Sequence, residues 1–358
     1  MGPRVRALVQ RGSLLAMAEK AARVSTRDTT NPAFAAALIE ARDGTLFVAA
    51  ADDRRMVTCR SQATVEDQGI AAVPCHRLLT FAKAASDGVV EMESDGSSAT
   101  LRCGGAKAVL HVMGGECIGG FRARPVEAGV TADASELLAI AKPCSRQVAK
   151  ETTRPELMGI HVVAGGGSLR MEACDTIRAV SCSVAADGSM DAIVPPYALT
   201  DALAQGDGEV ELGLGDGVLT VSTGNCEYVT RTFSGTYPNI SALFSGHPCA
   251  TAVADSADLA AALDALATVD SPSVTFEVTE DGLLLSAATR RDGSADAFVP
   301  ADSRGDGSVA LNPKYVRDSL VMGGEVRVEL FGTMRPAFVK SDRYGWTCML
   351  MPMRGDFV

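Results

Sequence analysis

The chain has 358 residues, of which 47% are hydrophobic and 22% charged, and its formal net charge is −11. This composition is typical of a chain that buries a core, and it excludes a mainly disordered, collagen-like or coiled-coil protein. No apolar run reaches the roughly 18 residues of a membrane span, and Met1–Arg6 lacks the apolar stretch of a signal peptide, so we expect a cytoplasmic protein.

Predicted helices and strands alternate along the chain. Apolar residues at helical spacing predict a helix over 13–24. A Gly turn and alternating apolar positions predict a strand over 43–52, a helix begins near the proline of 73–82, and 89–93 alternates again. The same order returns twice, over 133–148, 166–175, 194–203 and 209–214, and then over 255–269, 281–290, 311–320 and 325–330.

The recurrence of these elements predicts three similar domains. The turn glycines Gly44, Gly167 and Gly282 are 123 and 115 residues apart. A unit of this length is too long for a solenoid repeat and long enough for a domain. Two helices and several short strands in each unit predict an α+β fold with the helices on one face of antiparallel sheets. The predicted domains are 1–126, 127–248 and 249–358.

Charge is unevenly distributed over these domains. Counting Lys and Arg against Asp and Glu gives 16 − 13 = +3 for 1–126, 7 − 15 = −8 for 127–248 and 10 − 16 = −6 for 249–358. Affinity for nucleic acid comes from Lys and Arg. A DNA-binding surface on this chain would therefore be a local basic patch on an acidic body.

The cysteines and histidines indicate no metal site. The ten cysteines contain no CxxC pair, and we expect them to be reduced and to serve as small apolar side chains. The four histidines lie in separate segments. The sequence also lacks the P-loop, HExxH and GxSxG motifs, so we expect no enzymatic activity, no catalytic residue, no metal and no cofactor.

The C-terminal segment carries a family resemblance. The phrase Leu311-Asn-Pro-Lys-Tyr-Val-Arg-Asp-Ser-Leu320, followed by Met334-Arg-Pro-Ala-Phe338 and Met351-Pro-Met-Arg354, resembles the end of the bacterial DNA polymerase III beta subunit, the DNA sliding clamp. The resemblance implies three clamp domains per chain and a head-to-tail dimeric ring. It further implies that the ring encircles double-stranded DNA without reading its sequence and tethers DNA polymerase and the clamp loader through short peptide motifs.

The resemblance assigns three sets of residues. Basic side chains on the repeated helices would face DNA, namely Arg11, Lys20, Arg23, Arg77, Lys83, Arg146, Lys150, Lys314 and Arg317. A pocket for partner peptides would contain Leu157, Cys174, Thr176, Ile177, Arg178, Ala179, Pro238, Leu243, Met349, Met351, Pro352 and Met353. Leu110 and Leu266 would anchor the seam between the two copies.

The chain departs from the family pattern at several places. Where the family phrase has Gly and His, this chain has Thr176 and Ile177, which we expect to narrow the pocket. Gly355–Val358 extends beyond the usual ending and could cover the pocket or be disordered, and the stretch 255–270 is acidic where the family is basic. These departures leave open a specialised second clamp that tolerates an inhibitor aimed at the pocket. An enzyme on repeated α+β domains is the remote alternative.

Overall fold

The computed structural model describes residues 5–27, 29–113, 128–151, 153–204 and 208–353. The chain divides into two compact units, which are described separately. The first unit combines Met1–Ser135 with Asp201–Thr232, and the second combines Glu136–Thr200 with Phe233–Val358.

The described part of the first unit contains the helices α1 (Arg11–Val24) and α2 (Cys75–Ala84) with antiparallel strands around them. Its strands are β1 (Val5–Gln10), β2 (Ala36–Arg42), β3 (Thr45–Ala51), β4 (Arg55–Gln62), β5 (Thr64–Asp67), β6 (Gly69–Pro74), β7 (Val89–Ser94), β8 (Ser98–Cys103), β9 (Ala106–His111), β10 (Ala128–Asp133), β15 (Glu209–Gly215), β16 (Val218–Thr223) and β17 (Cys226–Arg231). Three of its strands, β15–β17, come from the later segment Asp201–Thr232.

Two antiparallel sheets form in this unit. One has the order β5-β1-β7-β8-β9. The other runs β6-β2-β3-β4-β17-β16-β15-β10, so that β4 pairs with a strand far along the chain. In that pairing Cys59 lies opposite Cys226, and Arg55 lies opposite Thr230.

The second unit repeats the arrangement. Its helices are α3 (Ala134–Ser145), α4 (Pro196–Leu203), α5 (Ser256–Leu266) and α6 (Pro313–Ser319), with α3 and α4 each crossing the division between the units. Its strands are β11 (Ile160–Gly165), β12 (Ser168–Cys174), β13 (Arg178–Gly188), β14 (Met190–Val194), β18 (Ala250–Asp255), β19 (Val274–Thr279), β20 (Gly282–Thr289), β21 (Gly293–Pro300), β22 (Asp302–Gly305), β23 (Gly307–Leu311), β24 (Glu325–Leu330), β25 (Ala337–Ser341) and β26 (Trp346–Leu350).

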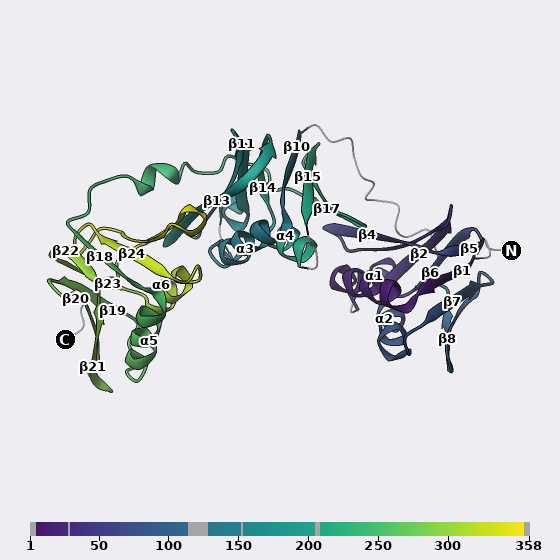
Figure 1. Cartoon of the computed structure of the whole chain (residues 1–358), viewed down its shortest axis with the longest axis horizontal. Helices are drawn as coiled ribbons and strands as arrows, with labels where there is room; N and C mark the ends of the chain where they lie inside the picture. The colour runs from purple at the N-terminus through teal and green to yellow at the C-terminus, as the bar shows by residue number, and fades with distance from the viewer. Residues whose placement is uncertain (1–4, 28, 114–127, 152, 205–207, 354–358) are drawn as a thin grey trace. The chain divides into compact units, whose positions relative to one another are not determined.

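The sheets of the second unit are also antiparallel. One runs β14-β11-β12-β13-β26-β25-β24-β18-β22, and the other runs β21-β20-β19-β23. The pairing of β13 with β26 matches the pairing of β4 with β17 in the first unit. Figure 1 shows these helices and strands, coloured along the chain from purple at the N-terminus to yellow at the C-terminus.

The order of elements confirms the predicted α+β fold and its threefold repeat. Each repeat has a strand, a helix, a group of strands, a second helix and three final strands, which are β7–β9, β15–β17 and β24–β26. Capping residues explain why the helices begin where they do, because side-chain oxygens satisfy free N–H groups of the first turn. Asp133 accepts from the Ser135 amide, Asp255 from the Ala257 amide and Asn312 from the Lys314 amide.

Two helices are shorter than the sequence predicts. The helix predicted over 255–269 is α5, which ends at Leu266. The helical spacing extends to Val148, whereas α3 ends at Ser145. Pro143 lies in its last turn and cannot donate a backbone hydrogen bond, which favours an early end. Among the described residues, no helix is long and apolar enough to cross a membrane. The predicted boundary between 126 and 127 lies outside the described residues, and the three-domain division remains a prediction.

Candidate functional site

A tight turn between β12 and β13 organises the predicted peptide pocket. The Asp175 carboxylate accepts from the amides of Ile177 and Arg178, at 3.1 and 2.9 Å. Thr176 lies at the tip with a φ of 75°. This left-handed conformation suits glycine and is costly for a β-branched residue. The turn therefore keeps the geometry of a glycine turn without its glycine.

Arg178 connects this turn to two other parts of the second unit. Its guanidinium donates to Asp175 at 2.9 Å, to Asp318 of α6 at 2.8 Å and to the Arg146 carbonyl that follows α3. It also lies 4.3 Å from the centre of the Tyr315 ring, a cation–π distance. Burial opposes the charge of Arg178, but the hydrogen bonds to Asp318 and Asp175 outweigh burial and raise its pKa. Arg178 is therefore a permanent cation held by two carboxylates.

The first unit contains an equivalent arginine. Arg55 opens β4 as Arg178 opens β13, and it donates to Asp52, three residues earlier, at 3.0 Å. It also donates to Asp201 of α4 and to the Arg23 carbonyl in α1. The two arginines thus make the same set of contacts from equivalent positions of consecutive repeats. At the third repeat, the same distance from the turn glycine brings the chain to Gly293, which has no side chain to make them.

An apolar cluster lies beside the Arg178 turn. It contains four of the predicted pocket residues, Leu157, Cys174, Ala179 and Met349. Buried side chains that the sequence reasoning missed complete it, namely Ala149, Ile193, Tyr237, Ile240 and Phe338, and three partly buried aromatic residues pack against it, namely Phe233, Phe244 and Phe331. Apolar residues recur every three or four positions over 233–244, a pattern that could have indicated part of this set.

Three predicted pocket residues expose apolar side chains at this place. Ile177 is 47% exposed, Leu243 is 46% exposed and Met351 is 40% exposed. The Met351 amide donates to the Ile177 carbonyl at 2.9 Å, so the backbones of these two residues are adjacent. Exposed large apolar side chains grouped over a buried cluster are typical of an interaction surface. The other predicted members are the exposed Thr176, the buried Arg178 and the half-buried Pro238, Pro352 and Met353.

A polar network lies next to this cluster. His161 contacts the carboxylates of Glu172 and Asp191 at 3.2 and 2.9 Å and stacks on Tyr237, which belongs to the cluster. Glu172 also accepts from Ser241 at 2.8 Å. Burial lowers the pKa of His161, but the two carboxylates outweigh burial and raise it above its usual value.

The predicted DNA-facing residues divide into exposed and engaged side chains. The exposed ones are Arg23, Arg77, Lys83, Arg146, Lys150, Lys314 and Arg317. Two of these are paired with carboxylates, since Lys83 contacts Glu19 and Arg317 contacts Asp264. Arg11 and Lys20 are half-buried, with Arg11 donating to the Lys83 carbonyl and Lys20 to the sulfur of Cys226. The acidic α5 thus places a carboxylate on the nearest basic side chain of α6.

The two predicted seam residues differ in exposure. Leu110 is half-buried on β9, whereas Leu266 is only 2% exposed and lies in the core at the end of α5. Two apolar side chains that are more exposed than these leucines lie on the terminal strands of two sheets. Val109 of β9 is 57% exposed, and Phe298 of β21 is 51% exposed. Among the described strands, β9 and β21 each end a sheet and leave one edge unpaired.

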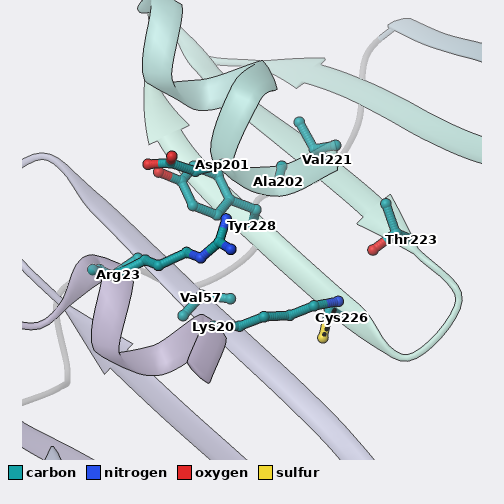
Figure 2. A pocket seen from close by; sticks show the side chains of 10 residues that line it. Lys20, Arg23, Val57, Asp201, Ala202, Val221, Thr223, Cys226 and Tyr228 are labelled. Carbon is teal, nitrogen blue, oxygen red and sulfur yellow. Dashed lines mark hydrogen bonds between the residues drawn. The ribbon is translucent and has the colours of Figure 1, made fainter. Parts of the chain in front are cut away.

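The expectation that all cysteines are reduced is wrong for one pair. Cys59 of β4 and Cys226 of β17 form a disulfide across 167 residues of sequence. Neither spacing nor composition indicates the pair, because the two cysteines meet only through the long-range pairing of these strands. Figure 2 shows Cys226 with Lys20 directed at its sulfur.

The chain is similar to known proteins over its first repeat and, with low identity, over most of its length. Residues 6–117 match the family model described as the DNA polymerase III beta subunit, N-terminal domain. A beta sliding clamp of Streptomyces coelicolor is 27% identical over 309 residues and 81% of each chain, and one of Chlamydia trachomatis is 23% identical over 97% of this chain and 86% of its own. The chain is related to the bacterial DNA polymerase III beta subunit.

Solved clamp structures extend the likeness over the whole fold. The sliding clamp of Pseudomonas aeruginosa, in a structure with bound griselimycin, matches with a TM-score of 0.91 at 22% identity and covers 99% of this chain and 100% of its own. The sliding clamp of Bacillus subtilis matches with a TM-score of 0.90 at 18% identity, over 98% of this chain and 100% of its own. The clamp fold therefore includes the second and third repeats, beyond the segment that the family model matches.

Proposed function

We propose that this chain is a DNA sliding clamp. Two copies join head to tail in a ring around duplex DNA, and the ring tethers a replicative polymerase as a processivity factor. The observation that carries the proposal is the likeness to solved sliding clamps over 98–99% of the chain, which includes all three repeats. We propose 1–126, 127–248 and 249–358 as the clamp domains. The proposed role involves no catalysis, metal or cofactor.

The unpaired edges of β9 and β21 support the closure of a ring. An exposed sheet edge is a template for pairing with another chain, and a head-to-tail contact joins different surfaces of two identical copies. The exposed Val109 and Phe298 provide apolar contacts at these edges. Sedimentation equilibrium tests the assembly, with an expected mass of twice 37.1 kDa. A monomer at micromolar concentration would contradict it.

Binding to DNA would rest on a few phosphate contacts. The exposed Arg23, Arg77 and Arg146 lie on or directly after repeated helices, and among the described residues none of the three has a carboxylate within ion-pair distance. Changing all three to Ala should weaken binding equally for every sequence. Each lost phosphate contact lowers the slope of log affinity against log salt by about 0.9, and a ring of two copies loses six of these side chains, so we expect a decrease of up to about 5. Arg317→Ala is the matched control, because Asp264 already neutralises Arg317.

Short peptides of the polymerase and the clamp loader would dock on the apolar cluster beside the Arg178 turn. The exposed Ile177, Leu243 and Met351 support this assignment. The left-handed Thr176 favours a pocket that differs from that of an ordinary clamp. Titration with a labelled clamp-binding peptide should show weaker binding to this chain than to its Thr176→Gly/Ile177→His variant. Equal affinities would remove the reason to propose a specialised clamp. The extension Gly355–Val358 lies outside the described residues.

A further inference from the structure

Two cysteines in neighbouring strands of the first unit have unequal surroundings. Cys59 of β4 is 0% exposed, whereas Cys226, the first residue of β17, is half-buried. Cys226 follows the Gly224–Asn225 turn and lines a polar groove with Arg42, Arg60 and Glu227. Of the two cysteines, Cys226 is therefore the one that small polar molecules in solvent can approach.

A lysine is aimed at the accessible sulfur. Lys20 of α1 places its Nζ 3.3 Å from the Sγ of Cys226 (Figure 2). An ammonium beside a thiol favours the thiolate, which is the nucleophilic form of cysteine. Burial, together with the nearby Arg23, lowers the pKa of Lys20, and this makes its ammonium a better proton donor. The same side chain can thus stabilise an attacking thiolate and protonate a leaving hydroxide.

We propose that Cys226 and Cys59 form a peroxide-reactive pair in which Cys226 is oxidised first, Cys59 resolves it into the observed disulfide, and Lys20 is the catalytic residue that stabilises the Cys226 thiolate and donates a proton. The substrate class is a small hydroperoxide, such as hydrogen peroxide. The cross-link joins β4 covalently to β17. The proposal concerns thiol chemistry of the first unit and does not depend on clamp function.

The reaction balances in two steps. The Cys226 thiolate attacks one peroxide oxygen, the O–O bond breaks, and a Cys226 sulfenic acid forms while the leaving hydroxide takes a proton from Lys20 to become water. The Cys59 thiol then attacks the Cys226 sulfur, the S–O bond breaks, and the leaving hydroxide takes the Cys59 proton to become a second water. Two thiols lose two protons and two electrons, and one peroxide becomes two waters. A dithiol reductant reverses the cross-link.

A second close pair of cysteines provides a contrast. Cys144 and Cys182 have sulfur atoms 3.4 Å apart, but both residues are buried, and the pair's other hydrogen bond runs from Cys182 to the Met171 carbonyl and not to a basic side chain. Their mutual hydrogen bond and burial raise the pKa of Cys144. A buried, protonated thiol reacts slowly with peroxide. Proximity alone would make both pairs equal, whereas access and the Lys20 ammonium favour Cys59 and Cys226.

Peptide mapping of the full chain tests the proposal. The reduced protein, with the exposed Cys249 changed to Ser in every variant, is treated with hydrogen peroxide and alkylated. Non-reducing gels and mass spectrometry should give a Cys59–Cys226 cross-link that a dithiol removes. Cys144→Ser/Cys182→Ser should keep this cross-link. In Cys59→Ser, dimedone should label Cys226, whereas in Cys226→Ser it should leave Cys59 unlabelled. Circular dichroism checks that each variant is folded.

The rate of cross-linking tests the role of Lys20. Lys20→Met should slow oxidation at pH 7 by at least about threefold, because one unit of thiol pKa changes the thiolate fraction tenfold and nucleophilicity offsets about half of this on a logarithmic scale. Lys107→Met, which removes an exposed lysine of β9, should leave the rate unchanged. A shift of the pH–rate midpoint in Lys20→Met alone would separate catalysis from packing. Equal rates in both lysine variants, labelling of Cys59 without Cys226, or no cross-link in the parent would overturn the proposal.

Discussion

Removing Arg178 should destabilise the second unit strongly. Arg178→Met keeps the apolar length of the side chain but removes its hydrogen bonds to Asp175, Asp318 and the Arg146 carbonyl. The carboxylates of Asp175 and Asp318 are only 15% and 21% exposed and would lose their shared cation. Breaking a buried ion pair costs about 3–5 kcal/mol. Because water still reaches both carboxylates, we expect about 3 kcal/mol.

The single tryptophan provides the assay. Trp346 is 0% exposed in β26, the strand that pairs with β13, so its fluorescence reports on the unit that contains Arg178. With a urea m-value of about 2 kcal/mol/M, a loss of about 3 kcal/mol lowers the unfolding midpoint by about 1.5 M. Arg291→Met is the control, because Arg291 is 90% exposed and its pair with Asp292 should contribute less than about 0.5 kcal/mol. Equal midpoints for the two variants would refute the reasoning.

Three further outcomes follow from the structure. Thr176→Gly should raise the stability of the second unit by about 1 kcal/mol, because it relieves the left-handed φ of 75°, and an unchanged or lower melting temperature would show that the turn is not strained. His161 has a raised pKa in the folded chain, so its stabilising contribution should be complete below its ordinary pKa and be lost as the pH rises through the folded value. Free energies of unfolding from urea titrations of wild type and His161→Gln should therefore differ most at acidic pH. The same difference at all pH values would contradict this. Phe298→Asp should convert the dimer into monomers without lowering the melting temperature of the monomer by more than about 2 °C, because the side chain is 51% exposed, and a variant that sediments as a dimer would place the seam elsewhere.

Local signals in the sequence were sufficient for the elements and their repeat. Pro at or near helix starts, Asp133 and Asp255 as caps, and turn glycines such as Gly44 and Gly167 act within a few residues, so a single sequence reveals them. The same holds for the Asp175 turn, whose hydrogen bonds reach only to Arg178.

Long-range pairing explains what the sequence did not reveal. The Cys59–Cys226 disulfide depends on the register between β4 and β17, which no local pattern encodes. A contact between α1 and β17, also distant in sequence, directs Lys20 to the sulfur of Cys226. The position of Lys20 on a basic helix had predicted a DNA-facing side chain. Similarly, Phe338 and the aromatic residues that pack around it belong to the apolar cluster beside the Arg178 turn, but they come from segments that meet only in the folded unit.

Retention on circular DNA tests the proposed clamp most directly. The chain is loaded onto a nicked circular plasmid with a clamp loader and ATP, free protein is removed by gel filtration, and half of the sample is then cut once by a restriction enzyme. A ring that encircles DNA stays with the circle and leaves the linear molecule by sliding off its ends, at a salt concentration that abolishes ordinary phosphate binding. We predict retention on the circle and loss after cutting. Equal retention before and after cutting would contradict topological binding and with it the sliding-clamp function.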